Sequence, residues 1–327
     1  MTTPFPEEAD LTAALADAVD DSPTWDQWAA AEPQIAPLIA ALRAGHATAG
    51  PSDDVLRAGI DPAWDVAALL SHVTHRTAHI YGEMAGRRAD AHDLPALLDA
   101  FFGADRARMR VAKWALTTPA LPEALPPLLR VVEEFDAEAG PRFHRNRIAD
   151  VRPILAATPE TLPIARAWLR AAGWARPSVA LSILEVQAQQ ADVLPLRALL
   201  AASLDRELQD PWAPYTVEGC LAALAPFAAE VPYAELARVF ESTRALWPRC
   251  GAAELMAEGH PATFSGAYAI ECLWDCEEEL VRIGCASADL ALPMVRERLH
   301  LLAHSPYEDE AVRQAARQRL GSSPPQD

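Results

Sequence analysis

Six Leu-Pro or Val-Pro dipeptides in this chain each stand ahead of an apolar stretch. The spacings are 31, 37, 32, 37 and 61 residues, and the dipeptides are Leu94-Pro95, Leu125-Pro126, Leu162-Pro163, Leu194-Pro195, Val231-Pro232 and Leu292-Pro293. Proline suits the first position of a helix, where its missing N–H group costs no hydrogen bond. Self-similarity on this scale is typical of repeat arrays, in which each helical hairpin buries its apolar stripe against the next.

Composition agrees with a helical chain, since 51% of the 327 residues are hydrophobic and only 14 are glycine. The 61-residue spacing predicts an insertion in the array, with interruptions at Trp247-Pro248 and from Gly251 to Pro261. A long helix is expected to follow from Ala267 to Gly284. Another long helix is expected to begin at Asp61-Pro62 and to end near Gly86, because Asp61 suits the N-cap position.

The last unit, Leu292 to Leu320, predicts two short helices. The second has an acidic first turn, followed by Val312, Arg313, Ala316 and Leu320. This pattern resembles the second helix of a HEAT repeat, so the chain is similar to HEAT and armadillo-like proteins over about residues 61 to 320. The resemblance implies an all-α superhelix, an α-solenoid of helical hairpins whose curved surface binds another macromolecule.

Charge and turn signals divide the chain into three parts. We predict that residues 1–60 form a helical N-terminal cap. The cap is acidic, because no lysine or arginine precedes Arg43. Residues 61–320 predict the HEAT-like array, and residues 321–327 predict a disordered tail. A turn-rich break from Gly45 to Asp54 lies within the predicted cap.

The formal net charge of −18 disfavours a nucleic-acid backbone or an anionic membrane as the main ligand. It favours a protein partner with a basic patch. One lysine stands against 27 arginines, a skew typical of a GC-rich bacterial genome. The chain shows no secretory signal, no apolar run of bilayer length and no CxxC pair, so we expect a cytoplasmic protein with reduced thiols.

Three histidines, His72, His75 and His79, follow one another at helical spacing and suggest a metal site as an alternative. On one continuous helix they would span roughly 10 Å, so only neighbouring pairs could chelate one ion. The HExxH motif of metalloproteases is missing. We therefore expect no metal and no cofactor, with this histidine face kept as the place where a metal-dependent or small-molecule function would lie.

Two charged clusters are candidate partner-binding surfaces. Arg142, Arg145 and Arg147 form a dense basic cluster, and Glu277 and Glu278 belong to an acidic run. Some DNA glycosylases share the helical repeat architecture and grip phosphates through basic grooves. A nucleic-acid-processing enzyme is accordingly a further alternative, which the net charge disfavours.

The tryptophans fall into two groups. Trp114, Trp168 and Trp274 lie inside expected repeat helices, which predicts core positions. Trp174 and Trp212 lie at turns between helices and are candidate anchors for a partner. No catalytic signature is found, because GxSxG, GxGxxG and P-loop patterns are all missing. The sequence thus favours a non-enzymatic scaffold, adaptor or inhibitor that binds a protein through the surface of the array.

Overall fold

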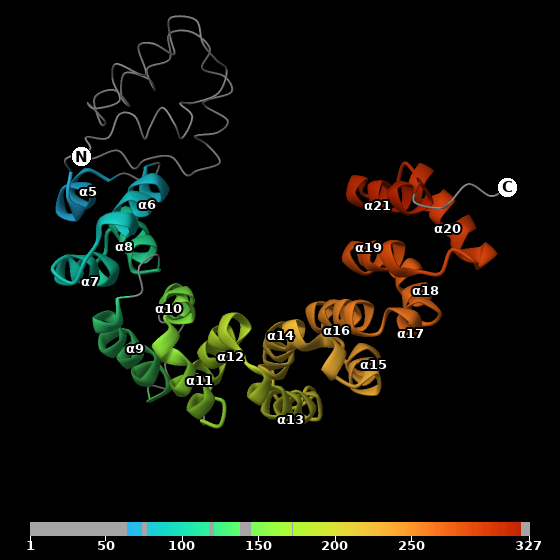
Figure 1. Cartoon of the computed structure of the whole chain (residues 1–327), viewed down its shortest axis with the longest axis horizontal. Helices are drawn as coiled ribbons and strands as arrows, with labels where there is room; N and C mark the ends of the chain where they lie inside the picture. Colours follow the sequence, from blue (N-terminus) through green and yellow to red (C-terminus); the bar gives the residue numbers. More distant parts are fainter. Residues whose placement is uncertain (1–63, 74–76, 118–120, 138–144, 172, 322–327) are drawn as a thin grey trace, which may run out of the picture. The chain divides into compact units, whose positions relative to one another are not determined.

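The computed structural model describes residues 64–73, 77–117, 121–137, 145–171 and 173–321. Regular structure in these ranges is entirely helical, which confirms the predicted all-α class. The contacts between residues divide the chain into two compact units, Met1–Ala124 and Leu125–Asp327 (Figure 1). The predicted N-terminal cap and tail lie outside the described residues, apart from the helical Gly321. The predicted boundary at residue 60 therefore stays a prediction.

The described part of the first unit consists of four α-helices and a short 3-10 helix. They are α5 (Val66–His72), α6 (Ala78–Arg88), α7 (Leu94–Phe102), α8 (Arg106–Thr117) and η2 (Pro122–Ala124). Helix α6 makes its main contact with α8. Gly82 permits this packing, because a Cβ atom at that position would lie 2.6 Å from Cβ of Trp114.

The single long helix predicted before Gly86 is wrong. Helix α5 begins after Asp65, whose carboxylate accepts a 2.8 Å hydrogen bond from the backbone nitrogen of Ala68. It ends at His72, because Val73 adopts an extended conformation with ψ of 142°. Val73 is β-branched and suits extended backbone better than helix. Residues 61–63, with the expected N-cap Asp61, lie outside the described residues.

The second unit contains the remaining helices. Its α-helices are α9 (Leu125–Ala137), α10 (Arg145–Ala157), α11 (Leu162–Trp168), α12 (Ala175–Gln187), α13 (Val193–Leu204), α14 (Ala213–Leu224), α15 (Tyr233–Ser242), α16 (Leu246–Gly259), α17 (Pro261–Ser265), α18 (Tyr268–Leu273), α19 (Glu278–Ser287), α20 (Pro293–His304) and α21 (Glu310–Gly321). Its 3-10 helices are η3 (Pro159–Thr161), η4 (Gln190–Asp192) and η5 (Ala225–Glu230).

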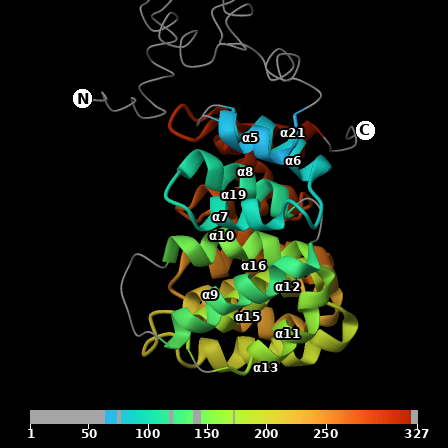
Figure 2. The same cartoon turned by 90° about the vertical axis from the view of Figure 1, so that its left-hand side faces the viewer.

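Neighbouring helices of this unit pack as hairpins, and the second helices of successive hairpins also contact one another. The hairpins are α11/α12, α13/α14, α15/α16, α18/α19 and α20/α21. The contacts between second helices run from α10 to α12, α14, α16, α19 and α21 in chain order. Figures 1 and 2 both place α11 and α13 on the same side of this unit, away from α12.

The Leu-Pro and Val-Pro dipeptides mark helix starts as predicted. They coincide with the beginnings of α7, α9, α11, α13, α15 and α20. In α15, Pro232 is the N-cap residue, and in α20 Pro293 is the first helical residue. The sequence pattern therefore located the beginnings of six helices.

The predicted insertion after α15 is wrong, because that stretch contains further packed helices. Helix α16 runs unbroken through Gly251, with Trp247 and Pro248 in its first turn. The long helix expected from Ala267 to Gly284 is instead α18 and α19, which pack against each other. Asp275 lies in their connection, where its carboxylate accepts from the backbone nitrogen of Glu277 and pairs with Arg249.

This break also separates Cys272 from Cys276. Cys272 is buried in α18, whereas Cys276 is exposed in the connection to α19. Trp168 is buried as expected, but Trp114 and Trp274 are half-exposed, so the core prediction is wrong for those two.

Glycines allow the second helices to approach closely. A Cβ atom at Gly219 of α14 would lie 3.0 Å from Cβ of Leu181 on α12. At Gly284 of α19, a Cβ atom would lie 2.8 Å from the backbone nitrogen of Leu273 and 2.9 Å from the carbonyl oxygen of Ala269. Because those two obstacles are backbone atoms, no side-chain rotation can relieve the overlap.

We predict that Gly284→Ala lowers the free energy of unfolding by about 1–3 kcal/mol, since the added methyl group overpacks the α18/α19 contact. Gly266→Ala is the matched control, because nothing lies within 4 Å of the Cβ position there. Urea unfolding measures both changes. Equal stability of the Gly284→Ala protein and the wild type would contradict the close packing.

Candidate functional site

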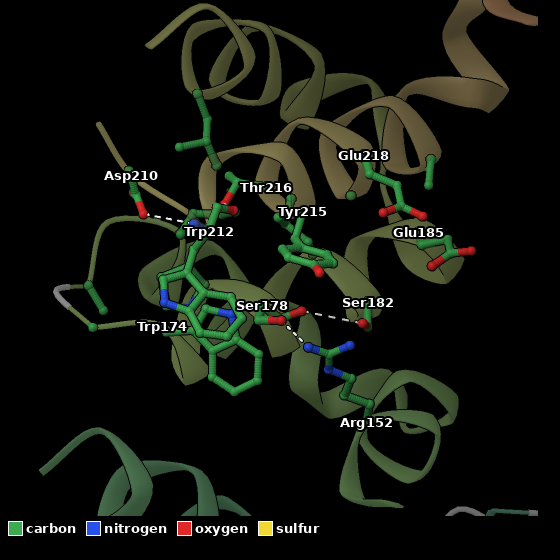
Figure 3. Close-up of a pocket in the computed structure, with 18 of the residues that line it drawn as sticks. Arg152, Trp174, Ser178, Ser182, Glu185, Asp210, Trp212, Tyr215, Thr216 and Glu218 are labelled. Atoms are coloured by element: carbon green, nitrogen blue, oxygen red, sulfur yellow. Dashed lines mark hydrogen bonds between the residues drawn. The ribbon is translucent and has the colours of Figure 1, made fainter. Parts of the chain in front are cut away.

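The second unit contains a pocket of about 1000 Å³ across α10, α12 and α14. One end is aromatic, with Trp174, Trp212 and Tyr215. The other end is charged, with Arg152, Glu185 and Glu218. The hydroxyl groups of Ser178 and Ser182 lie between them (Figure 3). The pocket therefore offers an apolar surface and charged groups to the same ligand.

The aromatic end is held in place by a carboxylate at the start of α12. Asp136 of α9 accepts hydrogen bonds from the backbone nitrogens of Trp174 and Ala175 at 3.1 and 2.8 Å. It also accepts from the backbone nitrogen and Nε of Arg176 at 3.0 and 2.8 Å. Its side chain is only 3% exposed. A carboxylate is favourable there, because the first N–H groups of a helix are unpaired and carry partial positive charge.

Gly173 makes room for this cap. Its φ of 101° lies in the left-handed region, where other residues are strained. A Cβ atom there would lie 2.6 Å from a carboxylate oxygen of Asp136. The turn before α12 thus requires glycine, and it delivers the Trp174 side chain to the pocket.

The aromatic side chains form a continuous row. The ring centroids of Trp174 and Trp212 are 4.9 Å apart, and those of Trp212 and Tyr215 are 5.7 Å apart. Phe135 extends the row behind Trp174, at 5.6 Å. The backbone nitrogen of Trp212 donates a 2.9 Å hydrogen bond to Asp210, which fixes the turn before α14. Tyr215 is 61% exposed, so the row ends in an accessible ring.

At the charged end, Arg152 is held by two neighbours on α12 and the preceding turn. Its guanidinium donates to the hydroxyl of Ser178, and its Cζ lies 5.7 Å from the centroid of Trp174. Burial lowers the pKa of Arg152, while the charges of Glu185 and Glu218 act to raise it. Arg152 forms no ion pair with either glutamate, and its Nε is buried without a partner. The two carboxylates are therefore not neutralised by direct contact.

The surroundings of Glu218 on α14 disfavour the ionised form of its carboxyl group. Partial burial raises its pKa, the negative charge of Glu185 raises it further, and the positive charge of Arg152 opposes both. Glu185, Glu218 and Arg152 leave an excess of negative charge among themselves. Arg170, Arg206 and Asp210 also line the pocket, so its full lining has three positive and three negative side chains. A cation placed there would relieve the repulsion between the carboxylates.

The cysteines of the described chain lie outside this pocket. Four of the five cysteines are buried, and burial raises the pKa of Cys250 and Cys285 to about 11. A thiol with a raised pKa is a poor nucleophile, because the thiolate is the reactive form. The pocket itself contains neither histidine nor cysteine.

The structure brings together two of the predicted anchor residues and leaves the other candidates apart from them. Trp174 and Trp212 share the pocket, although they lie 38 residues apart in the sequence. Glu277 is the N-cap residue of α19, and Glu278 lies in the first turn of that helix. Neither of these glutamates lines the pocket.

The basic cluster lies only partly within the described residues. Arg142 falls outside them. Arg145 and Arg147 belong to the first turn of α10, and their side chains are not described. The predicted role of this cluster stays a prediction.

The histidine face is not formed by one helix. His72 ends α5 and stacks on Trp64 at 4.5 Å, His79 belongs to α6, and His75 lies outside the described residues. In the described part of the chain, no group of three or more His, Cys, Asp or Glu side chains could hold a metal ion.

The sequence contained an overlooked signal for this pocket. Arg152, Glu185 and Glu218 recur at intervals of 33 residues, one on each successive second helix. Trp174 and Trp212 each precede an alanine at the start of such a helix. A charged residue at a fixed interval indicates one shared face of these successive helices. Which side chains of these three helices line one pocket can be predicted only once the relative register of the helices is known.

Comparisons with known proteins supply no assignment: neither a family model nor a curated protein matches the chain. Within the described ranges, every helix is too short or too polar to cross a bilayer.

We predict that Asp136→Asn lowers the free energy of unfolding by about 1.5–3 kcal/mol, because it replaces a buried charged acceptor of four hydrogen bonds. Asp205→Asn is the matched control, since Asp205 pairs with Arg238 at an exposed position. That surface pair contributes roughly 0–1 kcal/mol. Equal losses in the two variants, measured by urea unfolding, would contradict the capping role.

We predict that Glu218→Gln raises Tm at pH 7. Because folding raises the pKa of Glu218, its contribution favours the folded state at low pH and is lost as pH rises through the folded pKa. Glutamine does not ionise, so the variant does not lose this stability as the pH rises. The gain should vanish below about pH 4, where the unfolded carboxyl group is also protonated. A lower Tm for the variant at pH 7 would show that the negative charge stabilises the fold.

Proposed function

We propose that this chain is a non-enzymatic protein-binding scaffold whose second unit is a HEAT-like α-solenoid. The contacts between successive second helices support that architecture, because each hairpin packs against the next in chain order. An array of this kind presents the same face of several helices to one extended partner. The proposed partner is a protein with an exposed basic segment.

The pocket across α10, α12 and α14 is the observation that carries this proposal. It places an accessible aromatic row beside two carboxylates that form no ion pair. Exposed aromatic side chains held by a rigid scaffold are frequent anchors in protein interfaces. The net charge of −18 extends the attraction for a basic partner beyond the pocket.

The two alternative functions have less support in the described part of the chain. A metal-dependent function at His72, His75 and His79 has no single helix face to use, since α5 ends at His72. A nucleic-acid-processing function relies on Arg142, Arg145 and Arg147, whose side chains are not described. The scaffold is the function that the described geometry supports best.

Selection from a random-peptide phage library on the immobilised full chain tests this proposal. We expect enriched peptides whose binding is lost in Trp212→Ala, because that change removes the centre of the aromatic row. Trp247→Ala is the matched control, as Trp247 is also exposed but does not line the pocket.

Binding of the enriched peptides should fall at least tenfold in Trp212→Ala, which corresponds to about 1.4 kcal/mol, and should stay unchanged in Trp247→Ala. A library that yields no enriched sequence would contradict the scaffold. Peptides that bind both variants equally would move the docking surface away from this pocket.

A further inference from the structure

The pocket combines features that together specify one class of ligand. Its aromatic end can cover a long apolar body, and its charged end has two carboxylates near one guanidinium. Lysine and arginine side chains have this dual nature, with an aliphatic stem and a cationic head. Most other protein side chains match either the aromatic end or the charged end of the pocket, but not both.

We infer that the pocket receives a single arginine or lysine side chain of the partner, with its cationic head between Glu185 and Glu218 and its aliphatic stem against Tyr215 and Trp212. This inference rests on the proposed scaffold function and names the chemistry of its docking site. Its occupant is a basic segment of a second protein.

The resident Arg152 does not already fill this role. Its guanidinium is held by the Ser178 hydroxyl and by the Trp174 ring, and it makes no ion pair with Glu185 or Glu218. Arg152 therefore offsets part of the negative charge of Glu185 and Glu218 without closing the pocket. Its positive charge also limits how strongly a second cation is attracted.

Tyr215 supplies the surface for the aliphatic stem. It lies on the same helix as Glu218, three residues earlier, so both side chains occupy one face of α14. Figure 3 shows Tyr215 between the two tryptophans and the charged end of the pocket. A stem that follows Tyr215 brings its cationic head toward Glu218. Arginine adds stacking of its planar guanidinium on aromatic rings, so we expect arginine to bind more tightly than lysine.

Glu254, on the second helix of the next hairpin, provides a matched control for Glu218. Like Glu218, Glu254 of α16 belongs to the exposed residues, and partial desolvation of its carboxyl group and the nearby charge of Glu279 raise its pKa. Glu254 does not line the pocket. Replacing it removes a similar charge from the unit while leaving the proposed site intact.

Saturation-transfer NMR on the full chain tests the inference with three small probes: N-acetyl-arginine methylamide, its neutral citrulline analogue and N-acetyl-glutamate methylamide. We expect the arginine derivative to bind at least tenfold more tightly than the citrulline derivative, and the glutamate derivative not to bind. Glu185→Gln and Glu218→Gln should each weaken arginine binding about fivefold to tenfold, whereas Glu254→Gln should leave it unchanged. Circular dichroism confirms that each variant is folded.

Arg152→Gln gives a result of opposite sign. Removal of this positive charge should strengthen binding of the arginine derivative, because Arg152 then no longer offsets the negative charges of Glu185 and Glu218. If the pocket instead binds an anion through Arg152, the glutamate derivative binds and Arg152→Gln abolishes that binding. Equal binding of arginine and citrulline, or equal effects of Glu218→Gln and Glu254→Gln, would also overturn the inference.

The outcomes separate this inference from the scaffold function. Phage-selected peptides that need Trp212 but tolerate Glu185→Gln and Glu218→Gln would keep the scaffold and remove the cation site. Arginine binding in the pocket without any enriched peptide would keep the cation site and remove the scaffold.

Discussion

Packing between successive second helices is the constraint on which the second unit depends. A single hairpin leaves one apolar stripe uncovered, so α12 must contact both α10 and α14. Gly219 lets Leu181 approach closely at the α12/α14 contact. This repeated contact fixes the register between helices. Fixed register brings residues 33 positions apart onto one face, and that is how Arg152, Glu185 and Glu218 come to line the same pocket.

The pocket also depends on how the second helices begin. Asp136 satisfies the first backbone N–H groups of α12 and thereby positions Trp174. Asp210 accepts one hydrogen bond from the backbone nitrogen of Trp212 and positions that residue in the same way. Because both tryptophans precede the first turn of their helices, the stacking of α12 on α14 places their rings in contact. Polar caps thus determine the position of an aromatic surface, and the carboxylates further along the same helices supply its charge.

Most of the helical layout was predictable from the sequence, but the site was only partly so. Proline before an apolar run identified six helix starts, because that signal is local. The same local logic failed at Val73, where an extended residue ends α5, and at Asp275, whose carboxylate caps the turn before α19 and pairs with Arg249. Trp174 and Trp212 were predicted as anchors from their turn positions. Their partnership with Glu185 and Glu218 required the relative register of three helices, which no local pattern contains.

The most direct test of this account is a structure of the full chain bound to a peptide enriched on the wild-type protein. The account predicts an arginine or lysine head between Glu185 and Glu218, with its stem on Tyr215 and the peptide backbone crossing α12 and α14. A peptide bound on the side formed by α11 and α13, or one that places a carboxylate against Arg152, would contradict it.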